Sequence, residues 1–338
     1  MKEKTINKNI LFFNLDRDIL LKDINDVEIL SIDRIRDNYF SDLSIFLYDK
    51  PFSNELMEFV NVIVKNFKKE DLKIFYSNIR HLDVKKFDEN KYNKGKKNHT
   101  LAYYKPYNNT VYISNEINTS GIYHELFHMS TAIKYNKYLF VGFDQTDLVS
   151  NKSFGVGINE GYTQLLSERY FDKAQKGYPS LVHDLLLIEN LIGKEKMESL
   201  YMQCNLYGLI DELKNYISYE DICRFITYTD YIKHNMYNKN VSDRKVAIMG
   251  QMCAYINMFI VTCYLNKYIN QLPNTPEERE DMINTLCMLF NKLIVRININ
   301  NKLVECSFTD NIEYLERILE GFDYLGLDCK ELKQKKLV

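Results

Sequence analysis

Two histidines and a glutamate, arranged as His-Glu-x-x-His, are the residues of this chain best suited to metal chemistry. They are His124, Glu125 and His128. On a helix, residues four apart share a face, so the two imidazoles can be directed at one metal ion. Glu125 lies one position along and is not drawn into the coordination shell. Because the chain has only six histidines among 338 residues, this pattern rarely arises by chance, and we interpret it as a zinc site.

The third metal ligand has to come from another segment, because catalytic zinc usually takes three protein ligands and leaves one position to water. Glu160, in the sequence Asn-Glu-Gly, lies near the start of a second predicted amphipathic helix, residues 157–171. We expect Glu160 to be the third ligand. Glu168 is the alternative, although its position is more typical of a solvated or ion-paired helix residue. A glutamate at a helix start can also simply interact with the helix dipole.

At these positions the chain resembles the gluzincin zinc metallopeptidases. In that clan the His-Glu-x-x-His helix provides two ligands and the general base, and a glutamate on a following helix, often within Asn-Glu-Gly, is the third ligand. His124, Glu125, His128 and Glu160 match this pattern residue by residue. The resemblance covers residues 100–171, about a fifth of the chain. It implies a zincin-like fold, one zinc ion per chain, and hydrolysis of peptide or protein substrates.

Two features depart from the clan's pattern. The interval of thirty-one residues between His128 and Asn159 is longer than usual. Gln164 occupies a position that is often acidic in the clan, where the acid bonds a ligand histidine. A glutamine oxygen can still accept from an imidazole N–H, but without a charge it raises ligand basicity less. The second departure therefore concerns zinc affinity and not the existence of the site.

The implied mechanism assigns a role to each residue of the site. Bound zinc would lower the pKa of a water molecule toward about 7, and Glu125 would take its proton and later deliver it to the leaving amine. The clan also uses a tyrosine or histidine on a later helix as an oxyanion donor. Tyr228 and Tyr231, with His234 three positions on, are the candidates for that role. Since the chain has 26 tyrosines, a purely structural role is the alternative.

Strands are predicted on both sides of the zinc helix. Residues 100–105 and 110–114, around a Pro-Tyr-Asn-Asn turn, form a hairpin pattern. Its edge could pair with an extended peptide substrate, although an ordinary structural hairpin fits the pattern equally well. Residues 138–143 predict another strand, and residues 144–157 predict a loop that shapes access to the site.

The predicted fold class is α+β, with an N-terminal lobe that carries a small sheet and the zinc helix, and a helical C-terminal lobe. We divide the chain into a mixed α/β region (1–99), a zinc-binding catalytic core (100–175) and a helical domain (176–338). The first region contains predicted strands at 10–14 and 27–32, a helix at 54–67 and a polar loop at 91–99. From residue 177 the pattern is almost wholly helical, with helices at 181–191, 194–206, 218–231, 244–268 and 309–322 and a capping box at Thr275.

Composition limits the remaining possibilities. A net charge of −2 gives no general attraction to nucleic acid or anionic membranes. The apolar segment 248–265 is interpreted as a core helix and not a membrane span, and the N-terminal apolar patch is too short for a secretion signal. All seven cysteines lie at or after Cys204 and read as reduced thiols. These features favour a cytoplasmic protein, and the richness in Lys, Asn, Ile and Tyr without any Trp suggests a bacterial source. A catalytically silent zinc-stabilised binding protein and an exported toxin or effector protease are the alternatives, and the oligomeric state is left open.

Overall fold

The computed structural model describes residues 47–88, 101–114, 121–174, 176–236, 242–291, 295–299, 302–306 and 312–327. The chain is divided into two compact units, one formed by Met1–Val182 with Lys194–Leu206 and the other by His183–Gly193 with Tyr207–Val338. The architecture is mixed α+β, as predicted, with small sheets and a C-terminal region rich in helices. The predicted strands at 10–14 and 27–32 and the predicted loop at 91–99 lie outside the described residues.

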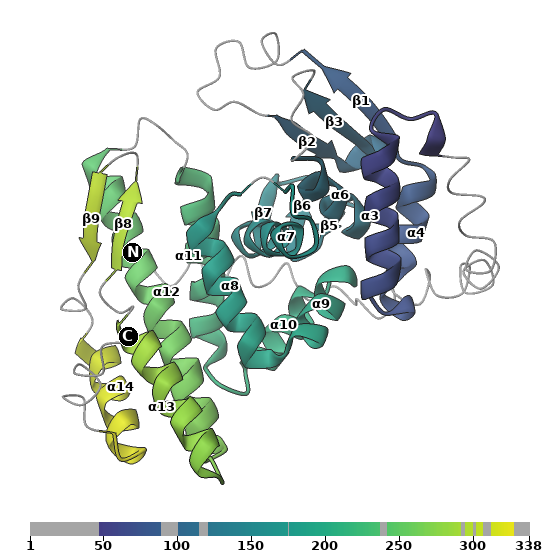
Figure 1. Ribbon diagram of the computed structural model, residues 1–338. Coiled ribbons are helices and arrows are strands. Elements are labelled where there is room, and N and C mark those ends of the chain that lie inside the picture. Colours follow the sequence, from purple (N-terminus) through teal and green to yellow (C-terminus); the bar gives the residue numbers. More distant parts are fainter. Residues whose placement is uncertain are drawn as a thin grey trace. The chain divides into compact units, whose positions relative to one another are not determined.

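The first unit carries the proposed site (Figure 1). Its elements in chain order are α3 (Ser53–Asn66), η2 (Lys69–Leu72), α4 (Lys73–Arg80), β1 (Asp83–Phe87), β2 (Ala102–Lys105), η3 (Pro106–Asn108), β3 (Thr110–Ser114), α6 (Ile122–Thr131), β4 (Ala132–Tyr135), β5 (Tyr138–Val141), β6 (Asp144–Asp147), β7 (Lys152–Phe154), α7 (Val156–Tyr170) and α9 (Lys194–Met202). Helices α8 (Pro179–Ile192) and α10 (Leu206–Leu213) cross the boundary between the units.

The predicted hairpin is confirmed and belongs to a sheet with the strand order β1-β3-β2. Strand β2 pairs antiparallel with β3, and β1 pairs with β3 in parallel. Val111 and Ile113 lie two positions apart on β3 and share a buried face, and Thr110 and Ser114 at the two ends of the strand are buried as well. Among the described residues, β2 has a strand neighbour on one side only, so its other edge faces away from the sheet.

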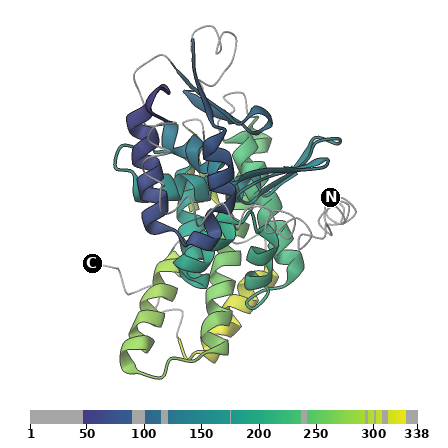
Figure 2. The ribbon, with the colours of Figure 1, turned by 90° about the vertical axis from the view of Figure 1, so that its right-hand side faces the viewer.

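A second sheet, in the order β4-β5-β6-β7, begins directly after α6, and its residues are in the blue to teal part of the colour scale in the turned view of Figure 2. The prediction of a strand at 138–143 is confirmed by β5, but the prediction of a loop at 144–157 is wrong. Strands β6 and β7 form because their backbones continue the antiparallel ladder from β5. The polar side chains that suggested a loop pair across the ladder, as in the 2.8 Å hydrogen bond between the hydroxyls of Thr146 and Ser153.

Helix α6 is fixed inside the core of the first unit. Leu126 and Phe127 are completely buried, and the Phe127 ring meets that of Phe59 on α3 edge to face with centroids 5.1 Å apart. At the C-terminal end of the helix, the Asn78 amide donates to the carbonyls of Met129 and Ala132, each at 2.7 Å. The Met129 carbonyl also accepts from the backbone N–H of Ala132, and the two bonds from Asn78 tie the end of the helix to α4.

The second unit contains helices α11 (Tyr219–Asn235), α12 (Asp243–Asn270), α13 (Pro276–Asn291) and α14 (Ile312–Tyr324) and the strands β8 (Val295–Ile299) and β9 (Lys302–Cys306). The predicted helices here are confirmed. The capping box at Thr275 is also confirmed, because its hydroxyl accepts from the Glu278 N–H and the Glu278 carboxylate accepts from the Thr275 N–H. Helix α12 is anchored by stacking of Phe259 on Phe225 of α11, with centroids 4.4 Å apart.

Three details of the helical prediction are corrected. The antiparallel hairpin β8–β9 interrupts the region expected to be almost wholly helical, and the alternation of apolar and polar residues in Val295–Ile299 accounts for it. The predicted helix 194–206 breaks at Cys204, which has a φ of 54° and whose thiol donates to the carbonyl of Thr131. Helix α7, predicted to be amphipathic, is buried on most of its circumference.

Helix α12 contains the apolar segment 248–265, which the sequence predicted to be a core helix and not a membrane span. It is long and apolar enough to cross a membrane by length and composition, and 61% of its most apolar window is buried inside the structure. A core helix of a soluble protein has the same properties, so the helix gives only weak evidence about location.

Candidate metal centre

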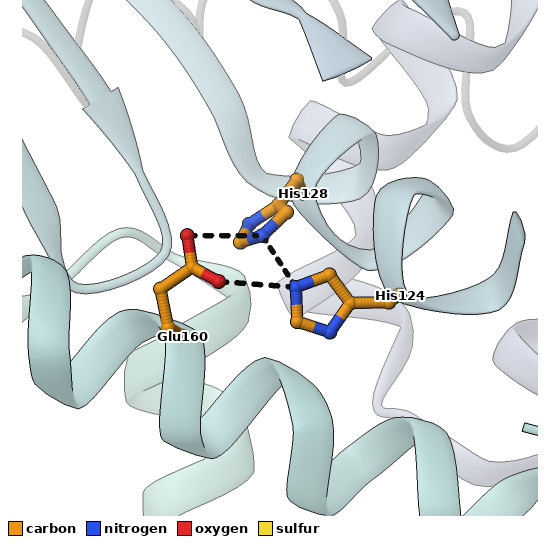
Figure 3. A group of neighbouring side chains, drawn as sticks. All are labelled: His124, His128 and Glu160. Carbon is orange, nitrogen blue, oxygen red and sulfur yellow. Dashed lines mark hydrogen bonds and ion pairs between the residues drawn. The ribbon is translucent and has the colours of Figure 1, made fainter. Parts of the chain in front are cut away.

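Three side chains from two helices bring their donor atoms together (Figure 3). Nε2 of His124 lies 3.0 Å from Nε2 of His128 and 3.3 Å from Oε2 of Glu160. Nε2 of His128 lies 3.9 Å from Oε1 of Glu160. In the part of the chain that the structure describes, these residues form a group that could hold a metal ion. The predicted metal ligands are therefore adjacent in space.

The two histidines converge because both lie on α6, one turn apart. The helix is rigidly packed, so the imidazoles share a face that is nearly buried, with side-chain exposures of 13% for His124 and 11% for His128. Glu160 reaches them from α7, which contacts α6 directly. Its side chain is 16% exposed.

Glu125 lies on the same helix but is not in the group of three. Its Oε2 accepts a 2.8 Å hydrogen bond from the backbone N–H of Tyr104 on β2. Tyr104 lies opposite Val111 of β3 in the sheet. Its N–H bonds Glu125 of α6, so this N–H is on the edge of β2 that faces α6. The carboxylate expected to act as a base is thus oriented by a backbone group.

The start of α7 is placed by two tight approaches of backbone. Gly155 precedes the helix with a φ of 87°, and a Cβ there would overlap the carbonyl oxygen of Phe143. Gly142 has a φ of 52°, and a Cβ there would overlap the Asn159 Oδ1 and the Tyr201 ring. Both positions therefore require glycine. They bring the corner between β5 and β6 against the first turn of α7, next to Glu160.

The second ring nitrogen of His124 is bonded to Gln164. Its Nδ1 lies 3.1 Å from the Oε1 of Gln164, and the Nε2 of that amide donates to Glu168 at 2.7 Å. Gln164, expected as a weaker substitute for an acid, does accept from His124. Glu168, the alternative third ligand, is directed at Gln164 instead of at the histidines.

The second ring nitrogen of His128 is bonded to Asn159. The Asn159 Oδ1 accepts from the backbone N–H of Phe143 at 3.1 Å, which leaves its Nδ2 3.3 Å from Nδ1 of His128. An amide N–H can only donate, so His128 accepts at Nδ1 and carries its proton on Nε2. The 3.0 Å bond to His124 is then a donation from His128 Nε2 to His124 Nε2.

The pKa of His124 reflects two opposed effects, its burial and the carboxylate of Glu160. Burial alone would lower the pKa of His124, but the protonated ring can donate to Glu160, and the charges of Glu160 and Glu125 also favour that form, so the pKa is raised above its usual value of 6.5. A carboxylate this close to two imidazoles favours positive charge between them. The same charge complementarity would favour a metal cation.

The oxyanion candidates lie elsewhere in the chain. Tyr228 and Tyr231 are on α11 in the second unit, on the helix predicted for them. The ring of Tyr228 packs edge to face on Tyr255 at 5.1 Å, and the Tyr231 carbonyl accepts from the Asn235 amide at 2.8 Å. Their catalytic role stays a prediction.

Other residues at the site were missed by sequence reasoning. The ring of Tyr178 lies on that of His124, with centroids 6.1 Å apart and planes inclined by 27°. Asn159 was noted only as part of Asn-Glu-Gly, and Tyr104 only as part of a strand. The position of Asn159 immediately before Glu160 is a sequence signal for its role. The contacts of Tyr104 and Tyr178 depend on tertiary structure, and no local sequence pattern predicts them.

Comparisons with known proteins give no assignment: no protein-family model and no curated protein matches the sequence, and no solved structure matches the fold. The resemblance to the gluzincins therefore consists of four matching residues, three of which the structure brings together as a possible metal site.

Proposed function

We propose that this protein is a zinc-dependent metallopeptidase of gluzincin type, with His124, His128 and Glu160 as ligands and Glu125 as general base. One observation carries the proposal. Three donor atoms converge, while a second carboxylate, that of Glu125 on the helix of the two histidines, stays outside the group and is held in place by the edge of β2. A purely structural metal site has no need of a separately oriented carboxylate.

The donor set suits zinc in chemistry and spacing. Two imidazoles and one carboxylate are a common ligand set of catalytic zinc. With metal–ligand bonds of about 2.0–2.1 Å, the donor atoms of a tetrahedral site lie about 3.3 Å apart. In the structure the two imidazole nitrogens are 3.0 Å apart, and they lie 3.3 and 3.9 Å from the two different oxygens of the Glu160 carboxylate, which is close to this value. Small side-chain movements would therefore suffice to seat the ion.

When bound, zinc supplies acidification of a water molecule and polarisation of a substrate carbonyl. Glu125 accepts the proton of the attacking water and delivers it to the leaving amine. The Tyr104 N–H limits the rotation of the Glu125 carboxylate, so the base needs little reorganisation before each transfer. The edge of β2 beside this contact offers backbone groups to an extended peptide, a mode of binding that does not depend on side-chain identity. We further propose a cytoplasmic location and a zincin-like core.

The test compares wild type with two variants of the proposed site and one control variant. Wild-type protein should hold about one zinc ion per chain, measured by elemental analysis after dialysis, and His128→Ala should lose it. Glu125→Gln should retain zinc and fold, because the glutamine oxygen can still accept from the Tyr104 N–H. Its rate of peptide cleavage should fall by about 10²–10⁴-fold. Glu70→Gln, which removes an exposed carboxylate from η2, is the matched control and should cleave like wild type.

Substrates would be found by digesting a peptide library and mapping the new termini, which also distinguishes endopeptidases from exopeptidases. Equal rates for wild type and Glu125→Gln would refute the assigned base. A folded wild type that binds no zinc would refute the metal site. Zinc-loaded wild type that cleaves no peptide would favour a zinc-stabilised binding protein.

A further inference from the structure

Glu168 and Gln164 on α7 form a hydrogen-bonded row that ends at His124, a proposed ligand. Glu160, Gln164 and Glu168 share one face of the helix because residues four apart are neighbours on its surface. The Gln164 amide donates to Oε1 of Glu168 at 2.7 Å and accepts from the His124 ring at 3.1 Å. The backbone N–H of Gly177 also donates to Oε1 of Glu168, at 3.4 Å.

The direction of every bond in this row is set by Glu168. A carboxylate can only accept, so the Gln164 group that faces it must be the NH₂, and the amide oxygen must face His124. That oxygen can only accept, so Nδ1 of His124 must carry the proton. The lone pair of the neutral ring is then on Nε2, the atom that lies 3.3 Å from Glu160 in the metal group. Gln164 is 4% exposed, so bulk water cannot easily satisfy the amide in the opposite orientation.

We infer that Glu168 is a positioning residue that selects the metal-binding tautomer of His124 through Gln164. This inference rests on the metal-binding part of the proposed function. It assigns Glu168 a role that is neither that of a ligand nor that of a solvated helix residue. It also explains how a neutral glutamine can take the place of an acid beside His124. The negative charge is on Glu168, one helical turn further along the row. Its hydrogen bond from the amide NH₂ keeps the amide oxygen turned toward the ring as an acceptor.

The proposal is tested by reversing the row. In Glu168→Lys, the ammonium group can only donate, so it should bond the Gln164 oxygen and turn the NH₂ toward His124. The ring then carries its proton on Nε2 and binds metal poorly. We expect the zinc dissociation constant, measured by competition with a chromophoric chelator, to rise by roughly 10–100-fold. Glu168→Gln keeps an acceptor oxygen and should stay within a few-fold of wild type.

The rescue is a second substitution in the same protein. With Glu168→Lys and Gln164→Glu together, the new carboxylate can accept both from the lysine and from His124, so zinc affinity should return to at least that of wild type. Asp172→Lys is the matched control, because it makes the same charge reversal at an exposed position just after α7. It should leave zinc affinity unchanged. Should Glu168→Lys not fold, Glu168→Ala replaces it and should weaken zinc binding several-fold.

A second readout needs no bound metal. In chelator-treated protein, the ¹⁵N chemical shifts of the His124 ring should report a proton on Nδ1 in wild type and on Nε2 in Glu168→Lys. Wild-type zinc affinity in a folded Glu168→Lys, or failure of the double variant to recover, would overturn the inference. If wild type binds no zinc, the proposed function fails, while the ring tautomers still decide the role of Glu168.

Discussion

Replacement of Asn159 by aspartate should tighten zinc binding. In the structure the Asn159 oxygen is used by the Phe143 N–H, and its NH₂ group is turned toward Nδ1 of His128. That arrangement favours a proton on His128 Nε2, the atom that has to be free for a metal. An aspartate has two acceptor oxygens, so it can accept from Phe143 and from a protonated His128 Nδ1 at once.

The size of the effect follows from what changes at His128. Replacing an outer partner of a metal-binding histidine typically changes affinity by about 10–100-fold, and here the change adds both the correct hydrogen bond and a charge. We expect the dissociation constant to fall at least about tenfold, or roughly 1.4 kcal/mol. At saturating zinc, the increase in the free energy of unfolding that zinc produces should be larger in the variant than in wild type by the same amount. Without zinc the variant should melt below wild type, because Asn159 is 3% exposed and a carboxylate buried there is poorly solvated.

The assay combines chelator competition with thermal unfolding in the presence and absence of zinc. Gln164→Glu is the comparator, since it places an equal charge beside the other histidine, where an acceptor oxygen is already present. If hydrogen-bond direction matters as well as charge, Asn159→Asp gains more affinity than Gln164→Glu. Equal gains would show that charge alone acts, and an affinity below wild type in a folded Asn159→Asp would refute the reasoning about His128.

Three further outcomes are expected. Gly142→Ala should lower the free energy of unfolding by more than the roughly 1–3 kcal/mol that backbone strain alone costs, because there is no room for a Cβ at this position. Gly193→Ala is the control: Gly193 has a φ of 98°, but a Cβ there would have no atom within 4 Å, so the substitution adds backbone strain alone. Burial raises the pKa of Asp184 from 3.8 to about 8, so the folded protein holds a proton that the unfolded chain releases, and stability falls as pH rises between these values. Asp184→Asn should therefore lessen the loss of melting temperature between pH 5 and pH 8, and an unchanged loss would contradict this pKa. Of Tyr228→Phe and Tyr231→Phe, one should lower kcat by roughly 10²–10³-fold at unchanged zinc content; normal kcat in both would exclude these tyrosines as oxyanion donors.

Local sequence signals predicted the elements that are stabilised by interactions between residues close together in the chain. The capping box at Thr275 and the spacing of apolar residues in 54–67 reflect interactions within a helix, and both helices are found. The His-Glu-x-x-His spacing likewise depends only on helix geometry. Because Glu160 has a position near the start of a following helix, its approach to the histidines could also be anticipated, although thirty-one residues separate the two motifs.

What the sequence did not predict depends on partners distant in the chain. Strands β6 and β7 are polar, and they become strands through pairing that begins at β5. The break at Cys204 coincides with a bond from its thiol to the end of α6. The Tyr104 contact uses a backbone N–H, which every residue other than proline has, so residue type could not reveal it. In each case the deciding interaction is tertiary.

The two proposed imidazole ligands differ in what their second nitrogens contact, and this difference bears on how metal would be bound. His124 faces an acceptor whose orientation is fixed from Glu168, so its Nε2 is already suited to a metal. His128 faces an amide NH₂, and its Nε2 proton must move to Nδ1 before that atom can coordinate. Asn159 must then turn its oxygen from the Phe143 N–H to the ring. Metal binding is thus coupled, through one amide, to the backbone at the corner between β5 and β6, where Gly142 leaves room for Asn159 to make its present contact. A site built in this way would bind zinc less tightly than its three ligands alone imply, because part of the binding free energy is used to exchange one hydrogen bond for another.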